Sequence, residues 1–146
     1  MDTIQPLETT DWEQWRPLWQ GYLDFYRAEL AEATTEATFA RLCDAGQDAM
    51  FGFLAINAAG AGQGLVHCVV HASTWSRRPS CYLEDLFVAP GTRGSGLGRA
   101  LIERAKAAAD ERGAHHLYWH TQQYNGRARS LYDQVARPTS FVVYEM

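Results

Sequence analysis

The spacing of apolar residues predicts helices near the start of the chain. From residue 12 to residue 26, large apolar side chains recur at intervals of three and four, which is the period of a helix with one buried face. Thr10 or Asp11 is placed to cap this helix, and Pro17 should kink or divide it. A second helix is expected to begin at a Thr34–Thr35 cap.

Strand-like runs follow, separated by turn-forming residues. Short β-rich segments predict strands at residues 3–8, 50–57, 65–71, 81–88, 116–121 and 141–146. Two further apolar stripes predict helices over residues 97–113 and 125–135. The first strands pair antiparallel and a strand–loop–helix–strand unit follows. We therefore expect an α+β fold, a mixed sheet with helices on both faces, in a single domain of residues 1–146.

Composition narrows the class of protein. Of the 146 residues, 47% are hydrophobic and 21% are charged, an ordinary globular mix. The formal net charge of −4 argues against nucleic-acid binding, which usually needs a basic face. The chain does not start with a basic region and an apolar run, and no apolar stretch approaches the roughly 20 residues that span a bilayer. We expect a cytoplasmic protein without a membrane partner.

The cysteines and histidines do not form a recognisable ligand set. Cys43, Cys68 and Cys81 are odd in number and lack CxxC spacing, so we expect neither a disulfide framework nor a zinc site. None of the five histidines combines with a cysteine or carboxylate in a metal-binding pattern. We expect no metal cofactor.

A glycine-rich loop at residues 91–98 carries the clearest chemical signal. It follows a predicted strand and opens a predicted helix. Glycines allow the backbone to approach a ligand closely, and the free N–H groups and dipole of a helix start favour phosphate. Arg93 and Arg99 add charged donors. These features predict a pyrophosphate site.

Two familiar nucleotide-binding motifs do not fit this loop. A P-loop requires Lys and then Ser or Thr, but Leu97 and Gly98 occupy those positions. A dinucleotide-binding GxGxxG or GxGxxA motif read from Gly94 would need Gly or Ala where Arg99 stands. The phosphate ligand must belong to another class.

The pattern that fits is [RQ]xxGx[GA], present as RGSGLG at residues 93–98. With LEDLFV before it and Asn125, Ala128, Leu131 and Tyr132 after it, this segment resembles the acetyl-CoA motif of the GNAT superfamily of N-acetyltransferases. WQGYLDFY at residues 19–26 and YLED at residues 82–85 are similar to the subgroup of yeast histone/polyamine and diamine acetyltransferases. The resemblance covers nearly the whole chain. It implies the GNAT fold, a mostly antiparallel sheet splayed at its central strand.

The resemblance also implies how acetyl-CoA binds. The Val88 N–H would donate to the thioester carbonyl and steady the oxyanion that forms there. Asn125 would contact the pantetheine arm, although it is equally suited to cap the following helix. The acetyl-CoA-binding residues implied are Phe87, Val88, Arg93, Gly94, Ser95, Gly96, Leu97, Gly98, Arg99 and Asn125.

Catalytic roles follow from the same resemblance. Tyr132 matches the tyrosine that protonates the leaving thiolate, its alternative being a core tyrosine. Glu84 matches a general base that takes a proton from the amine. Glu84 and Asp85 alternate across the strand, so only one should face the cleft, and Asp85 either binds the acceptor or forms a buried pair. Tyr26 belongs to an aromatic stripe that lines an acceptor pocket or forms core.

The expected function is transfer of an acetyl group from acetyl-CoA to a primary amine, with a small cationic amine such as a polyamine as the lead acceptor. A protein amine or an antibiotic is an alternative acceptor, and a non-catalytic acetyl-CoA sensor or assembly domain is an alternative function. The resemblance implies a homodimer, in which residues 141–146 would suit pairing across subunits, although they suit an internal edge strand equally well. Residues 135–141 depart from the family, which usually has a glycine and an aromatic residue there.

Overall fold

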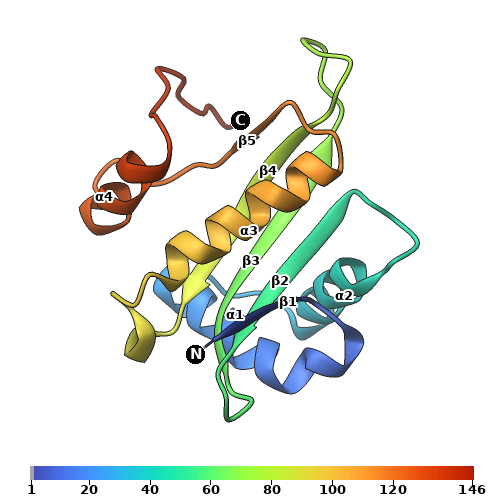
Figure 1. Cartoon of the computed structure of the whole chain (residues 1–146), viewed down its shortest axis with the longest axis vertical. Helices are drawn as coiled ribbons and strands as arrows, with labels where there is room; N and C mark the ends of the chain where they lie inside the picture. The colour runs from blue at the N-terminus through green and yellow to red at the C-terminus, as the bar shows by residue number, and fades with distance from the viewer. Residues whose placement is uncertain (1) are drawn as a thin grey trace.

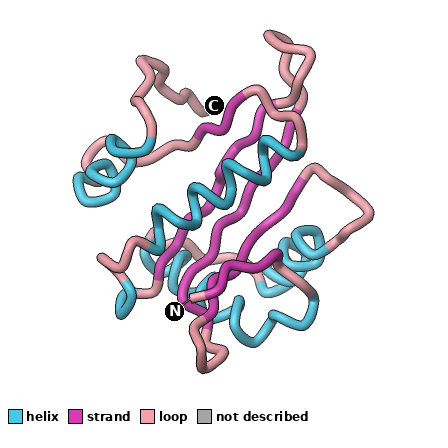
Figure 2. The backbone as a smooth tube through the Cα atoms, viewed as in Figure 1, coloured by secondary structure: helices cyan, strands magenta, loops and turns pink. Residues whose placement is uncertain are grey.

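The computed structural model describes residues 2–146, which form a mixed sheet flanked by helices (Figures 1 and 2). The strands lie in chain order across one sheet: β1 (Thr3–Pro6), β2 (Met50–Ile56), β3 (Gly62–His71), β4 (Ser80–Val88) and β5 (His116–Tyr118). β1 to β4 are antiparallel, and β5 is parallel to β4. The helices are α1 (Trp12–Phe25), α2 (Glu32–Cys43), α3 (Leu97–Glu111) and α4 (Gly126–Val135), with short 3-10 turns η1 (Thr9–Asp11) and η2 (Pro90–Thr92).

Helices cover both faces of the sheet, which confirms the expected fold class. In Figure 1 α3, in orange, crosses the near face, while α1 and α2, in blue and teal, lie against the other. The α3 side buries one cluster that includes Val66, Cys68 and Leu101, and the α1 side buries another around Trp15 and Leu65. Each face of the sheet therefore has its own hydrophobic core.

Of the kink or break expected at Pro17, the break does not occur. α1 runs without a break from Trp12 to Phe25. A proline inside a helix removes one backbone hydrogen bond and costs about 3 kcal/mol. The same helix buries Trp15, Leu18, Trp19 and Leu23, each worth about 1.5–3 kcal/mol. Burial of this face outweighs the local penalty.

The second helix begins earlier than the Thr34–Thr35 cap predicts. α2 starts at Glu32 after Ala31, and Thr35 is buried inside its first turns. The Thr35 hydroxyl accepts a hydrogen bond from Trp19 Nε1 at 3.1 Å. Thr35 joins α1 to α2 and does not cap its own helix.

A β-bulge interrupts β4 at Glu84. His67 of β3 pairs with Asp85, but the next residue, Cys68, pairs with Leu83, so Glu84 is the extra residue. The bulge reverses the alternation of the strand. Before it, odd-numbered Leu83 packs in the α3-side core; after it, even-numbered Leu86 and Val88 pack there.

β4 and β5 separate partway along the sheet. Their ladder joins Ser80–Tyr82 to His116–Tyr118 and stops there. The strand predicted over residues 116–121 is therefore shorter, because Trp119 and the residues after it leave the sheet. This separation gives the second half of β4 an edge that β5 does not cover, and it matches the expected splay.

The closing strand predicted over residues 141–146 does not form. These residues lie outside every strand of the described chain, and Phe141, Val142 and Tyr144 are 80%, 72% and 91% exposed. A β-rich sequence becomes a strand only when a neighbouring edge accepts its hydrogen bonds.

In residues 2–146 no helix is long and apolar enough to cross a membrane.

Candidate functional site

The loop between β4 and α3 has the backbone geometry of an anion site. Gly94 and Gly96 have φ angles of 85° and 86°, in the left-handed region that favours glycine. A Cβ built on either residue would meet no atom within 4 Å, so the loop surface is open. Gly96 caps the start of α3, whose first N–H groups and dipole face this surface.

The side chains of this loop differ in their contacts and in their burial. Arg93 Nε donates to Val88 O at 3.4 Å, and Arg99 forms an exposed ion pair with Glu103 at 3.0 Å. Ser95 Oγ donates to Thr92 O at 2.6 Å, and Leu97 is buried in the core. An exposed ion pair is worth little, so Arg99 can exchange Glu103 for a phosphate. Leu97 offers a ligand only its backbone.

Val88 presents its peptide groups to the uncovered edge of β4. The N–H of Ala89 donates to Gln63 O at 2.8 Å, toward β3. Because peptide groups alternate along a strand, those of Val88 point the opposite way. The contact from Arg93 to Val88 O agrees with this direction. Phe87, by contrast, turns its side chain into the α1-side core, and by the same alternation its peptide groups point toward Leu65 of β3.

The start of α3 and helix α4 face each other beyond this edge. A Cβ at Gly98 would lie 3.3 Å from Leu131 Cδ2 and 3.8 Å from Val88 Cγ2. Asn125 caps α4, accepting from the Ala128 N–H at 3.4 Å, so its alternative role as a cap is confirmed. No residue of Gly126–Val135 is fully buried. α4 therefore borders the edge of β4 without a core of its own.

Tyr132 projects from α4 and packs edge-on against Trp119, with ring centroids 5.4 Å apart. Burial raises the pKa of its phenol, and the nearby Tyr26 phenol raises it further. Tyr26 is the C-cap of α1, on the other face of the sheet. The two tyrosines approach each other past the end of the β4–β5 ladder. Tyr132 therefore keeps its proton at neutral pH, as a general acid must.

The aromatic stripe of α1 serves two purposes. Trp15 and Trp19, at 0% and 5% exposure, belong to the core. Tyr22 is half-buried and Tyr26 is exposed, and their ring centroids lie 5.1 Å apart. Burial raises the pKa of Tyr22, as does the charge of Asp85, and the Tyr22 hydroxyl donates to Glu84 O at 3.5 Å. The second half of the stripe thus lies over the β4 carboxylates.

Glu84 and Asp85 do not simply alternate across the strand, because the bulge separates them from the regular pleat. Burial raises the pKa of Glu84, and Asp85 raises it further, whereas the charge of Arg41 lowers it. The charge of Asp85 also raises the pKa of Tyr26 after the effect of burial. The charges of both carboxylates raise the pKa of Tyr22, and the regular alternation expected for this pair is not observed.

Asp85 also has a partner that the sequence did not reveal. Its Oδ2 accepts from His67 Nδ1 at 2.9 Å, and His67 Nε2 accepts from Trp15 Nε1 at 3.0 Å. The alternative of a buried pair for Asp85 is thereby confirmed. Trp15 and His67 are 52 residues apart in the chain, so no local pattern could have connected them.

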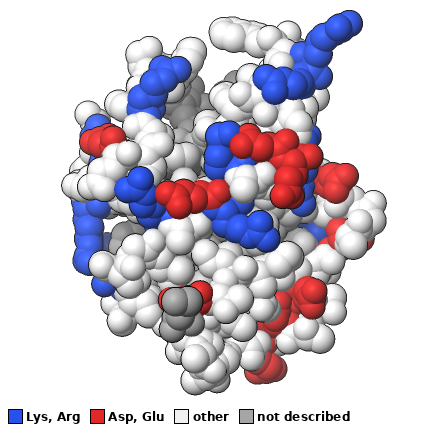
Figure 3. All heavy atoms as spheres, in the orientation of Figure 1, with Lys and Arg blue, Asp and Glu red and all other residues white. Residues whose placement is uncertain are grey.

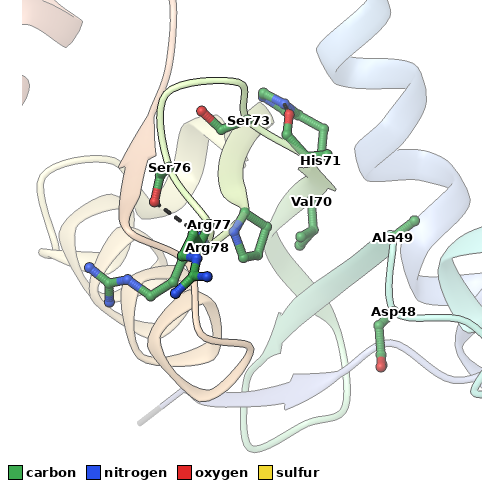
Figure 4. Close-up of a pocket in the computed structure, with 10 residues that line it drawn as sticks. Asp48, Ala49, Val70, His71, Ser73, Ser76, Arg77 and Arg78 are labelled. Carbon is green, nitrogen blue, oxygen red and sulfur yellow. Dashed lines mark hydrogen bonds between the residues drawn. The ribbon is translucent and has the colours of Figure 1, made fainter.

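Two hollows lie near opposite ends of β4. One, of about 810 Å³, runs between α1 and the β2–β3 turn and reaches Phe87 and Arg93. The other, of about 400 Å³, lies where β4 begins and is lined by His71, Arg77 and Arg78 among others (Figure 4). β4 spans nine residues, so this second hollow is roughly 30 Å from the glycine loop.

Surface charge and metal ligands add little to the site. On the face shown in Figure 3, acidic and basic side chains are interspersed, and along α3 they pair as Arg99 with Glu103 and Lys106 with Asp110. Across residues 2–146, no group of three or more His, Cys, Asp or Glu side chains is placed to hold a metal ion.

Comparison with known proteins identifies the class. The profile of the acetyltransferase (GNAT) family matches residues 4–136. The D-amino-acid N-acetyltransferase HPA3 of Saccharomyces cerevisiae is 35% identical over 97% of this chain and 88% of its own length. The uncharacterized N-acetyltransferase YhfO of Bacillus subtilis is 31% identical over 97% of this chain and 94% of its own length. The chain belongs to the GNAT family.

Solved structures agree on the fold. The aminoglycoside acetyltransferase AAC(6')-Iy, in complex with a CoA bisubstrate analogue, superposes with a TM-score of 0.88 at 18% identity, covering 100% of this chain and 97% of its own. A ribosomal-protein-alanine N-acetyltransferase from Brucella melitensis gives a TM-score of 0.76 at 22% identity, covering 100% and 98%. The protein is an N-acetyltransferase, of a family that uses acetyl-CoA to acetylate amines.

Proposed function

We propose that the protein acetylates a small cationic amine at the uncovered edge of β4. The observations that support this proposal are the Val88 peptide, which points to that edge, helix α4 with Tyr132, which borders it, and Glu84, which lies at the bulge of the same strand. The open glycine loop continues the edge toward the first turn of α3 and fits a pyrophosphate. Acetyl-CoA is thus a co-substrate that lies along β4, held at one end by the loop.

Each of the three groups has a separate task. Glu84 takes a proton from the acceptor's ammonium group, and the amine nitrogen then bonds to the acetyl carbon. The Val88 N–H stabilises the negative oxygen of that carbon. As the carbon–sulfur bond breaks, Tyr132 gives its proton to the sulfur, the nitrogen loses its second proton to solvent, and Tyr132 is reprotonated from solvent. The products are an N-acetyl amine and CoA, with one proton released.

The electrostatics of the acceptor side favour a cation. Glu84 and Asp85 supply two carboxylates, and Tyr22 and Tyr26 supply aromatic faces that attract an ammonium group. The likeness to the polyamine and diamine subgroup supports the same choice. The net charge of −4 would help to attract a polycation.

Two relatives support other acceptors. HPA3 is a D-amino-acid N-acetyltransferase at 35% identity, and streptothricin acetyltransferase of Streptomyces lavendulae is 40% identical over 55% of this chain. An amino acid carries a carboxylate that Glu84 and Asp85 would repel, which places it second. The presence of Glu84 and Tyr132 disfavours a non-catalytic sensor.

The test is release of CoA thiol from acetyl-CoA with a panel of amines. The panel contains polyamines, diamines, D-amino acids, aminoglycosides and a lysine peptide. We expect turnover that is fastest with polyamines or diamines. A preference for D-amino acids would redirect the acceptor assignment, and CoA binding without turnover on any amine would favour the sensor.

A homodimer joined through the C-terminal segment accompanies this proposal. Phe141, Val142, Val143 and Tyr144 are each more than 60% exposed, and residues 137–146 lie beyond the family match. An exposed β-rich segment is suited to pair with a strand edge of a second copy. Sedimentation of the wild type and of Val143→Asp tests this: a dimer that the aspartate dissociates is expected, and a monomeric wild type would exclude it.

A further inference from the structure

Beneath the acceptor side lies a buried chain of three polar groups, Trp15, His67 and Asp85. Trp15 and His67 are 0% and 2% exposed, and the Asp85 side chain is 14% exposed. They come from α1, β3 and β4. The indole Nε1 is 3.0 Å from His67 Nε2, and His67 Nδ1 is 2.9 Å from Asp85 Oδ2. The mechanism proposed above assigns no task to His67 or Trp15.

Hydrogen-bond roles fix the state of the imidazole. An indole N–H only donates, so His67 Nε2 must accept and carries no proton. The remaining proton is on Nδ1, where it is donated to Asp85. A second proton on Nε2 would set two N–H groups against each other in a dry site. His67 is therefore held as the neutral ring, and the charge of Asp85 is not cancelled.

The surroundings of the ring leave little freedom. Trp15 and Trp19 of α1 contact it with ring centroids at 5.9 and 5.3 Å, and a Cβ on Gly52 of β2 would lie 3.1 Å from its Cδ2. The charged groups acting around it are Asp85 and Glu84 from β4, with Arg41 of α2 acting on Glu84. Asp85 in turn lies beside Tyr22, at the start of the acceptor side.

We propose that His67 is a positioning residue for acceptor selection: locked by Trp15, it orients Asp85 as a full negative charge that binds the distal ammonium group of a diamine or polyamine. This inference rests on the proposed amine acetylation and deepens it. Glu84, the extra residue of the bulge, takes the proton from the reacting nitrogen, while Asp85 binds the second ammonium group. The site thereby distinguishes an acceptor with two ammonium groups from one with a single ammonium group.

The test compares a four-carbon diamine with the four-carbon amino alcohol, which has the same length but lacks the second charge. His67→Leu removes both hydrogen bonds. His67→Asn keeps a donor where Nδ1 stands and serves as the conservative rescue. His71→Leu, on the exposed end of the same strand, is the matched control. KM for each amine, KM for acetyl-CoA and kcat are measured for all four proteins.

We expect the wild type and His71→Leu to prefer the diamine. His67→Leu should raise KM for the diamine about tenfold or more, with little change for the amino alcohol or for acetyl-CoA, and His67→Asn should recover most of the preference. Equal losses for both amines would mean that His67 is merely structural and would overturn the inference. Failure of the wild type to acetylate any amine would overturn the proposed function and the inference together.

A measurement that needs no activity tests the lock itself. A two-bond proton–nitrogen spectrum of the imidazoles, assigned with His67→Asn, reports which ring nitrogen is protonated. The inference requires a proton on Nδ1 alone across neutral pH. A proton on Nε2, or a doubly protonated ring, would overturn it even if the enzyme acetylates amines.

Discussion

Gly98 in the first turn of α3 lies directly beneath Leu131 of α4: a Cβ at this glycine would come within 3.3 Å of Leu131 Cδ2. A branched side chain here would fill the space that also borders Val88. Gly98→Val should therefore weaken acetyl-CoA binding about tenfold, because overpacking separates α4 from α3. Isothermal titration with acetyl-CoA measures the change.

Gly91→Ala is the control for that substitution. It lies in the same loop, and its Cβ would meet nothing within 4 Å. Binding within about twofold of wild type is expected. Equal weakening in both variants would show that the loop, and not the contact with Leu131, limits affinity.

Replacing Tyr132 by Phe should lower kcat about 100-fold and leave KM for acetyl-CoA nearly unchanged, because the ring packing on Trp119 is kept and only the proton donor is lost. Burial holds the pKa of Tyr132 above its usual 10.0, so the wild-type rate should not decline through Tyr132 ionisation below pH 10. Steady-state kinetics from pH 6 to 10 test both points. Tyr124→Phe, an exposed tyrosine, is the control.

Glu84 must be unprotonated to act as a base. Its pKa is raised above the usual 4.5 by burial and by Asp85, so kcat/KM should fall as the pH drops through that raised value. Glu84→Gln should reduce kcat by about 100-fold or more and abolish this acid limb. Survival of the limb in the variant would assign it to another group. Glu111→Gln, far along α3, should behave as wild type.

Glu84→Gln should also stabilise the fold. A carboxyl group with a raised pKa binds its proton more tightly when folded, so stability falls as pH rises above the unfolded pKa, and the loss is complete above the raised, folded pKa. Glutamine removes that loss. We expect Glu84→Gln to raise Tm at pH 7 by up to about 2 °C, since the side chain is partly solvated, and to show no gain at pH 4. Thermal scans at both pH values measure this.

Thr35 links the two helices behind the sheet through the indole of Trp19. Thr35→Val keeps the shape but leaves the buried Trp19 N–H without its acceptor at 3.1 Å. Urea unfolding should show a loss of about 1–3 kcal/mol. Thr34→Val, at the exposed neighbouring position, should change the free energy of unfolding by less than about 0.5 kcal/mol. Similar values for both would remove the special role of the bond.

Sequence reasoning succeeded where the signal is local. The glycines at 94 and 96 sit between a strand and a helix, and their positive φ angles are what that pattern predicts. The α1 stripe also gave the right helix, because periodicity reports burial. It failed at Pro17 and at residues 141–146, where the outcome depends on packing or on a partner edge that lies elsewhere in the chain.

The candidate site divides in the same way. Tyr132, Glu84 and the loop residues could be proposed from the sequence because they lie in short motifs. The contacts from Trp15 to His67 and from His67 to Asp85 span 52 and 18 residues, and only the assembled sheet brings them together. The bulge at Glu84 was hidden because apolar residues occupy both faces of β4, so no break in alternation is visible.

That extra residue has a consequence for how the strand tolerates change in length. Deleting Glu84 would restore regular pairing without a shift in register, because Leu83 already pairs with Cys68 and Asp85 with His67. Phe87 and Val88 would keep their faces and their partners Leu65 and Gly64. A deletion later in the strand has no such extra residue to remove, and it would turn every side chain after it to the opposite face. Variation in length is therefore accommodated at the bulge and excluded from the rest of β4.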